Sequence, residues 1–116
     1  MAGLQVKDVS FVEVHDCFTI AEIMALDDIG FFNKGEDGRE SLDGLTAVYG
    51  KIPINSSGGL KAKGHPISAT GIAQIVGIHD QMLYKVDPNR QVSNPKVGLT
   101  HNVSATGGSV SINIFR

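Results

Sequence analysis

The chain has 116 residues and a net charge of −2, a length that suits one domain or part of one. Hydrophobic residues at 41% and charged residues at 19% indicate a globular chain and exclude a disordered one. Ten basic against twelve acidic side chains argue against a nucleic-acid partner and against an anionic membrane surface. The apolar runs are far too short for a membrane span.

The first half of the chain predicts a strand, a helix and a loop. Residues 10–15 alternate in polarity, which predicts a strand. Thr19 and Glu22 have the spacing of a capping box, so we expect Thr19 to cap a helix that ends at Gly30. The polar, glycine-containing residues 33–44 predict an exposed loop.

The middle of the chain predicts a short strand, a loop and a second helix. Residues 51–54 suit a short strand at a sheet edge or at a strand start, because Pro53 cannot donate to a ladder. A loop of small residues covers 55–66. The helix expected over 68–84 is apolar nearly all round, so we expect it to be buried in the centre of the structure.

The last third predicts a turn at 87–90 and two pairing strands at 97–101 and 110–115. Strands and helices therefore alternate along the chain. The predicted fold class is α/β, with a mixed sheet of about four strands, a buried central helix and a covering helix.

Residues capable of chemistry gather where strands end and helices begin. His15 and Cys17 follow the first strand, His65 precedes the second helix, and His101 and Asn102 end a strand. Ligand crevices form at such strand ends in α/β sheets. We therefore expect His15, Cys17 and His65 to converge on one face.

Cys17 is the only cysteine, which excludes an internal disulfide and a multi-cysteine zinc site. A helix start favours its thiolate, and His15 could exchange a proton with it. The alternative is a small buried hydrophobic residue, the commoner fate of a lone cysteine. The histidines lack metal-ligand spacing, so we predict no metal site.

His65 stands between Gly64 and Pro66, a position that suits a general base or a donor to an oxyanion. The alternative is a loop histidine with no role, and we interpret His79 as a structural or surface residue. The glycine pairs 58–59 and 107–108 either form tight turns or let a long cofactor lie against the backbone.

Four motifs then follow in order within positions 11–115: HDCF in the stretch 12–18, NSSGG at 55–59, GHP within 63–71, and HNV opening the stretch 101–109. This set resembles the C-terminal half of a thiolase. It is most similar to the sterol-carrier-protein branch and the related archaeal and bacterial acetyl-CoA acetyltransferases, in which HDCF replaces NEAF.

The resemblance implies a role for each catalytic residue. His65 would be the base that activates a nucleophilic cysteine. His15 would position the water of an oxyanion hole. Cys17 would supply the acid/base thiol that other thiolases take from a CxG motif, which this sequence lacks.

The substrate implied is a coenzyme A thioester, with no covalently bound cofactor. We assign substrate binding to the loop residues Ser57, Gly58, Gly59, His101, Asn102 and Gly107. Ser68, Ser104 and Ala105 depart from the family pattern by replacing glycines. If those positions need positive φ, the replacements are costly.

The family's nucleophile is a second cysteine in the N-terminal half, whereas this chain has only Cys17. We therefore interpret 1–116 as a C-terminal thiolase-fold domain, a fragment whose partner is the N-terminal half. We expect it to be inactive alone and to form a homo-oligomer, most simply a dimer.

The resemblance implies an acyl-CoA acyltransferase that performs Claisen condensation or thiolytic cleavage of a 3-ketoacyl-CoA. Two other functions stay open. One is a non-catalytic interaction module that stabilises a partner chain. The other is a small thioesterase that uses Cys17 as its nucleophile. The opening residues lack a signal peptide, so we expect a cytoplasmic protein, with a peroxisomal location left open for a eukaryotic parent enzyme.

Overall fold

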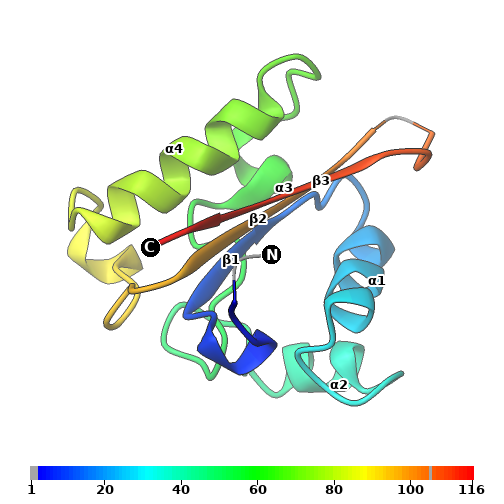
Figure 1. Ribbon diagram of the computed structural model, residues 1–116, viewed down its shortest axis with the longest axis horizontal. Helices are drawn as coiled ribbons and strands as arrows, with labels where there is room; N and C mark the ends of the chain where they lie inside the picture. The colour runs from blue at the N-terminus through cyan, green and yellow to red at the C-terminus, as the bar shows by residue number, and fades with distance from the viewer. Residues whose placement is uncertain (1–2, 105) are drawn as a thin grey trace.

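A computed structural model of the chain describes residues 3–104 and 106–116. Its helices and strands are, in chain order, η1 (Val6–Asp8), β1 (Phe11–Val14), α1 (Thr19–Ile29), α2 (Asp37–Leu42), α3 (Gly59–Lys63), α4 (Thr70–Met82), η2 (Pro88–Arg90), β2 (Gly98–Val103) and β3 (Val110–Phe115). The sheet lies between two helical layers, with α3 and α4 on one side and α1 and α2 on the other (Figure 1). Within the described ranges, no helix combines the length and the apolar character that crossing a bilayer requires.

The sheet has the order β1-β2-β3, with β1 parallel to β2 and β2 antiparallel to β3. The predicted α/β class and mixed sheet are confirmed, but the named sheet has three strands and not about four. Residues 51–54 contribute only an isolated parallel bridge from Ile54 to Val12. The amides of Ile52 and Ile54 donate instead to the carbonyls of Leu45 and Thr46, and Pro53 has no N–H to extend the ladder.

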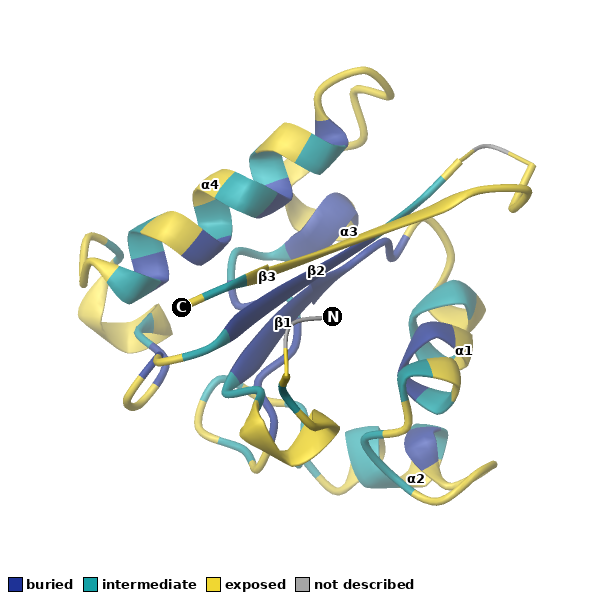
Figure 2. Ribbon diagram, viewed as in Figure 1, coloured by how far each residue is buried: buried dark blue, intermediate teal, exposed yellow. Residues whose placement is uncertain are grey.

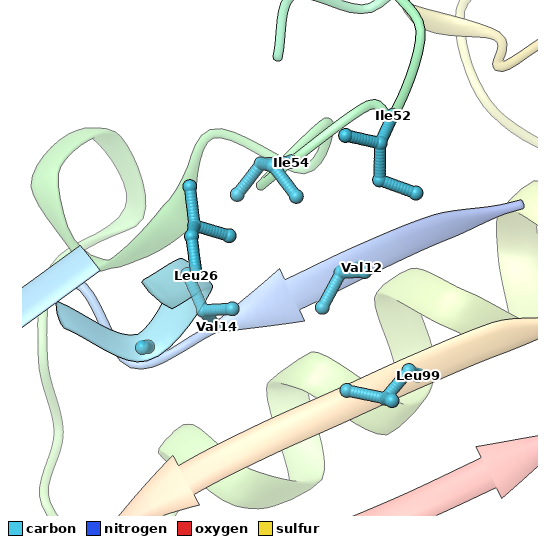
Figure 3. Packing of buried hydrophobic residues seen from close by; sticks show 7 residues of the cluster. Val12, Val14, Leu26, Ile52, Ile54 and Leu99 are labelled. Carbon is cyan, nitrogen blue, oxygen red and sulfur yellow. The ribbon is translucent and has the colours of Figure 1, made fainter. Parts of the chain in front are cut away.

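All four residues of β1 are buried, because helices cover both faces of this strand. On the α1 side, Val12 and Val14 join a cluster with Ala25, Leu26, Ile52, Ile54 and Leu99 (Figure 3). On the α4 side, Phe11 packs with Ile78 and Val92. These two clusters fix β1 as the centre of the molecule.

Helix α1 ends at Gly30 as predicted, in a left-handed conformation with φ 86°. Its predicted capping box is wrong. Thr19 is the first helical residue and the N-cap is Phe18, which makes no side-chain cap. The hydroxyl of Thr19 instead accepts from the ammonium group of Lys61 at 2.7 Å, which ties α1 to α3.

The exposed loop predicted over 33–44 contains helix α2, so that prediction is wrong for its second half. The side chain of Asn33 donates to Glu36, directly before the helix. Gly38 approaches the side chain of Ile23 on α1. Packing against α1 therefore stabilises a helix whose polar sequence does not predict one.

Helix α4 is not buried all round. Its buried residues lie on one stripe, Thr70, Gln74, Ile78 and Gln81, while Ile72 and Val76 on the outer face are 63% and 50% exposed. Figure 2 shows this division along the helix. Three of the four buried residues are polar because their side chains bond to backbone and side-chain partners, while Ile72 and Val76 face outward.

Strand β3 is exposed along most of its length (Figure 2). Its register pairs Ile114 with Leu99 and Ile112 with His101, so these two isoleucines lie on the α1 side of the sheet. Both remain substantially exposed. Apolar surface is thus open on β3 as well as on α4.

Candidate active site

The parallel pairing of β1 and β2 brings two polar side chains together at the ends of these strands. Val14 pairs with His101, so the next residues, His15 and Asn102, lie side by side. The Nδ1 atom of His15 is 2.6 Å from the amide oxygen of Asn102. An amide oxygen only accepts, so with this orientation of Asn102 the Nδ1 of His15 is the donor.

His65 reaches the same place from the loop before α4. Its ring centre lies 4.9 Å from that of His15, with the two planes 85° apart. Its Nδ1 is 2.7 Å from the hydroxyl of Thr70, the first residue of α4. The predicted convergence of His15 and His65 is therefore confirmed.

The two histidines line a pocket of about 440 Å³. Its other lining residues come from the loop before α4 and from the β2–β3 hairpin: Ile67, Asn102, Val103, Ser104, Ser109, Val110 and Ser111. The pocket therefore combines two imidazoles with an apolar wall and several hydroxyls. Such a surface can exchange protons and hold a partly apolar ligand.

Cys17 lies two residues after His15 and directly before Phe18, the N-cap of α1. It is a free, exposed cysteine, so the alternative of a buried hydrophobic residue is excluded. It is not among the residues that line the pocket of His15 and His65. The structure thus leaves Cys17 exposed, two residues along the chain from His15 and outside the pocket lining.

The predicted substrate-binding loop at 57–59 is held by two buried carboxylates of the β1 region. Glu13 accepts hydrogen bonds from both the backbone N–H and the hydroxyl of Ser57, and burial raises the pKa of Glu13. Asp16 accepts from the N–H of Leu60 at 2.7 Å, near the start of α3. No sequence pattern singles out these two carboxylates, although Asp16 adjoins His15 and Glu13 lies two residues before it.

Gly59 fits against Asp16 so closely that a side chain would collide with it. A Cβ at Gly59 would lie 2.2 Å from a carboxylate oxygen of Asp16, and its φ is +59°. Ser57, Gly58 and Gly59 do not line the histidine pocket. Their assignment to substrate binding stays a prediction. The contacts of Ser57 with Glu13 and of Gly59 with Asp16 hold the loop against the β1 region.

His101 lies on the opposite face of the sheet from Asn102, because successive residues of a strand point to opposite sides. Leu99, two residues earlier, packs in the cluster beneath α1. His101 is buried, which lowers its pKa, and the carboxylate of Asp28 on α1 opposes this shift. The structure therefore brings Asn102 to the pocket and directs His101 away from it.

Ser68 and Ser104, which stand where the family usually has glycine, show no backbone strain from a positive φ. Neither Ser68 nor Ser104 is among the non-glycine residues with positive φ in the described ranges. The hydroxyl of Ser104 accepts from the N–H of Ser109, and its carbonyl accepts from Gly107, which closes the β2–β3 hairpin. Ala105 lies outside the described residues.

The described residues contain no group of three or more His, Cys, Asp or Glu side chains placed to hold a metal ion. The chemistry open to this pocket is proton transfer and hydrogen bonding by His15 and His65. Imidazoles held by hydrogen bonds are typical of sites that move protons.

Comparison with known proteins identifies the family. Residues 1–116 match the family described as thiolase C-terminal domain-like. The chain belongs to this family. It is 50% identical over 115 residues to the acetyl-CoA acetyltransferase of Methanothermobacter thermautotrophicus, a match that covers 99% of this chain and 30% of that protein.

Other relatives are more distant. Sterol carrier protein 2 of Homo sapiens is 36% identical, with 99% of this chain and 21% of that protein covered. The benzoylsuccinyl-CoA thiolase subunit BbsB of Thauera aromatica is 38% identical, with 92% and 27% covered. The chain thus spans less than a third of the length of these relatives.

A solved structure supports the fold. The Ltp2-ChsH2(DUF35) aldolase matches with a TM-score of 0.76 at 22% identity, covering 86% of this chain and 25% of that chain. The thiolase-like α/β architecture expected from the motifs is therefore confirmed.

Proposed function

We propose that this chain supplies the C-terminal part of the active site of a thiolase-type acyl-CoA acyltransferase. The enzyme would cleave a 3-ketoacyl-CoA with coenzyme A, or form one by Claisen condensation of two acyl-CoA molecules. The observation that carries the proposal is the edge contact of His15 and His65 in one pocket. The relatives named as acetyl-CoA acetyltransferases and as a thiolase subunit support it.

In the cleavage direction, His65 takes the proton of a cysteine thiol supplied by the N-terminal part of the enzyme. The thiolate attacks the 3-keto carbon, and the bond between C2 and C3 breaks. The acyl group stays on the cysteine, and the departing acetyl-CoA enolate takes a proton at C2. Coenzyme A then attacks the acyl-cysteine thioester, and its thiol proton goes to the group that protonated C2. The released cysteine thiolate takes its proton back from His65 as acyl-CoA leaves.

Two residues of this chain assist the enolate. Cys17 is the donor of the proton to C2, a task for which its exposed thiol is accessible. His15 holds its Nδ1 proton toward Asn102, which leaves Nε2 to accept from a water. That water would donate to the thioester oxygen as negative charge develops on it.

The test is a chimera in which this chain replaces the matching region of the Methanothermobacter acetyl-CoA acetyltransferase. Cleavage of acetoacetyl-CoA by coenzyme A is measured. We expect the chimera to be active and the chain alone to be inactive. His65→Ala should lower kcat by about 100- to 10,000-fold, the usual loss for an acid/base group.

His79→Ala is the matched control, because His79 is exposed on α4 and bonds only to Asp80. It should leave the rate unchanged. A folded chimera whose activity is indifferent to both His15→Ala and His65→Ala would contradict the catalytic proposal. That result would favour the alternative of a non-catalytic interaction module, to which the exposed apolar side chains of α4 and β3 are also suited.

A further inference from the structure

Thr70 contacts the histidine to which the proposed function assigns the base. Its hydroxyl oxygen lies 2.7 Å from Nδ1 of His65 and 3.1 Å from the carbonyl oxygen of Pro66. Thr70 is 3% exposed and begins α4, so packing restricts the conformation of its side chain. A role for Thr70 in catalysis rests on the proposed function of His65.

The two contacts of Thr70 determine where protons lie. A hydroxyl group has one proton, and the carbonyl of Pro66 can only accept. Donation from a helical Thr to the carbonyl four residues earlier is a common arrangement of this side chain. When this proton is directed to Pro66, whose carbonyl also accepts the N–H groups of Ala69 and Thr70, Thr70 accepts from His65 and Nδ1 of His65 carries the proton.

A neutral imidazole protonated at Nδ1 has its lone pair at Nε2. His65 lines the pocket beside His15, so this lone pair is available to a thiol that enters the pocket. When Nε2 takes a proton, Thr70 still accepts from Nδ1, and the imidazolium keeps its partner. The opposite tautomer would present an N–H at Nε2 and could not act as the base.

We propose that Thr70 is a positioning residue that holds His65 in the Nδ1–H tautomer. Thr70 acts through His65, in the way that a hydrogen-bond partner on the far nitrogen fixes the tautomer of a catalytic or ligating histidine. His15 is held in the same tautomer by Asn102, with a different side chain as the acceptor.

The test measures the tautomer directly, by nitrogen NMR of the 116-residue chain labelled at its histidine rings. The spectrum is recorded at about pH 8, above the ordinary pKa of a free imidazole, because protonated and unprotonated nitrogens of a neutral ring resonate far apart. We expect His65 to be protonated at Nδ1 in the wild type. Thr70→Val, which keeps the shape but removes the acceptor, should shift His65 toward Nε2–H, and Thr70→Ser should restore Nδ1–H.

His15 and His79 are internal controls whose tautomers should not change in the Thr70 variants. A wild-type His65 protonated at Nε2 would overturn the proposal, and this measurement needs no variant to fold. A folded Thr70→Val chain that keeps His65 fully protonated at Nδ1 would overturn it as well.

Kinetics separate this role from the proposed function. In the chimera described above, Thr70→Val should lower kcat by about 10- to 100-fold, the usual loss for an outer hydrogen-bond partner. KM should stay the same, and Thr70→Ser should recover the rate. A chimera that is inactive with wild-type Thr70 would count against the proposed function, while the NMR result alone decides the tautomer.

Discussion

Asp16 is buried to 2% exposure, yet it stands between two candidate catalytic residues, His15 and Cys17. Its carboxylate bonds to the backbone of α3 and leaves no room for a side chain at Gly59. The geometry of the HDCF segment is thus joined to the glycine pair of a distant loop. One residue links the two motifs by packing and by a charge-assisted hydrogen bond.

Gly59→Ala should be more destabilising than an ordinary glycine replacement. A left-handed φ costs about 1–2 kcal/mol, and the collision with Asp16 adds about 1–3 kcal/mol. Gly44→Ala is the matched control, because Gly44 has φ +84° but open space around it. Urea denaturation of both variants measures the difference in the free energy of unfolding.

The same experiment in an Asp16→Ala background identifies the cause. Asp16→Ala alone should cost about 1–3 kcal/mol, because the N–H of Leu60 loses its acceptor. It also removes the atoms that Gly59→Ala would meet, so the double variant should lose less than the sum of the two. Strict additivity would show that the packing of Gly59 against Asp16 is not what selects glycine.

At the scale of single elements, α4 reverses the usual arrangement of polar and apolar residues. Gln81 accepts from the N–H of Val92 at 2.8 Å and donates to the carbonyl of Arg90 at 2.7 Å. It therefore pairs these two backbone groups of the segment around η2, which lie outside the sheet ladder. Val76, five residues earlier on the outer face, is half exposed.

Exchanging the two residue types should lower the free energy of unfolding at position 81 and leave it nearly unchanged at position 76. Gln81→Val should lower the free energy of unfolding by about 1–3 kcal/mol for each backbone group left unpaired. Val76→Gln should change it by no more than about 0.5 kcal/mol, as surface substitutions usually do. Equal destabilisation by both variants, measured by thermal or urea melts, would show that the outer face of α4 is buried in solution.

At the scale of the whole molecule, apolar side chains remain open on both layers. Ile72 and Val76 lie on α4, and Ile112 and Ile114 lie on β3. Exposed apolar side chains favour association where they gather in patches. The relatives are more than three times as long as the region they share with this chain.

We predict that the chain alone self-associates, most simply as a two-fold dimer. Light scattering over a dilution series measures this. Val76→Lys or Ile112→Lys should weaken association, whereas Leu42→Lys, on the separate helix α2, should not. A chain that stays monomeric at high concentration and melts cooperatively would show that 116 residues suffice without a cover.

The sequence by itself determined the order of β1, α1, α4, β2 and β3, the end of α1 at Gly30, and the meeting of His15 with His65. The first two follow from patterns between neighbours in the chain: side-chain period and a glycine that accepts a left-handed φ. The third follows from a general rule of α/β sheets, in which polar residues at strand ends and helix starts gather at one edge.

Only the tertiary structure decided which residues of these segments face the site. The register of β1 on β2 sends Asn102 to the pocket and His101 to the opposite face. Hydrogen bonds to distant backbone bury Gln74 and Gln81 and leave Ile72 outside. The physical reason is that a polar side chain's burial depends on its partner, and the partner here comes from another part of the chain.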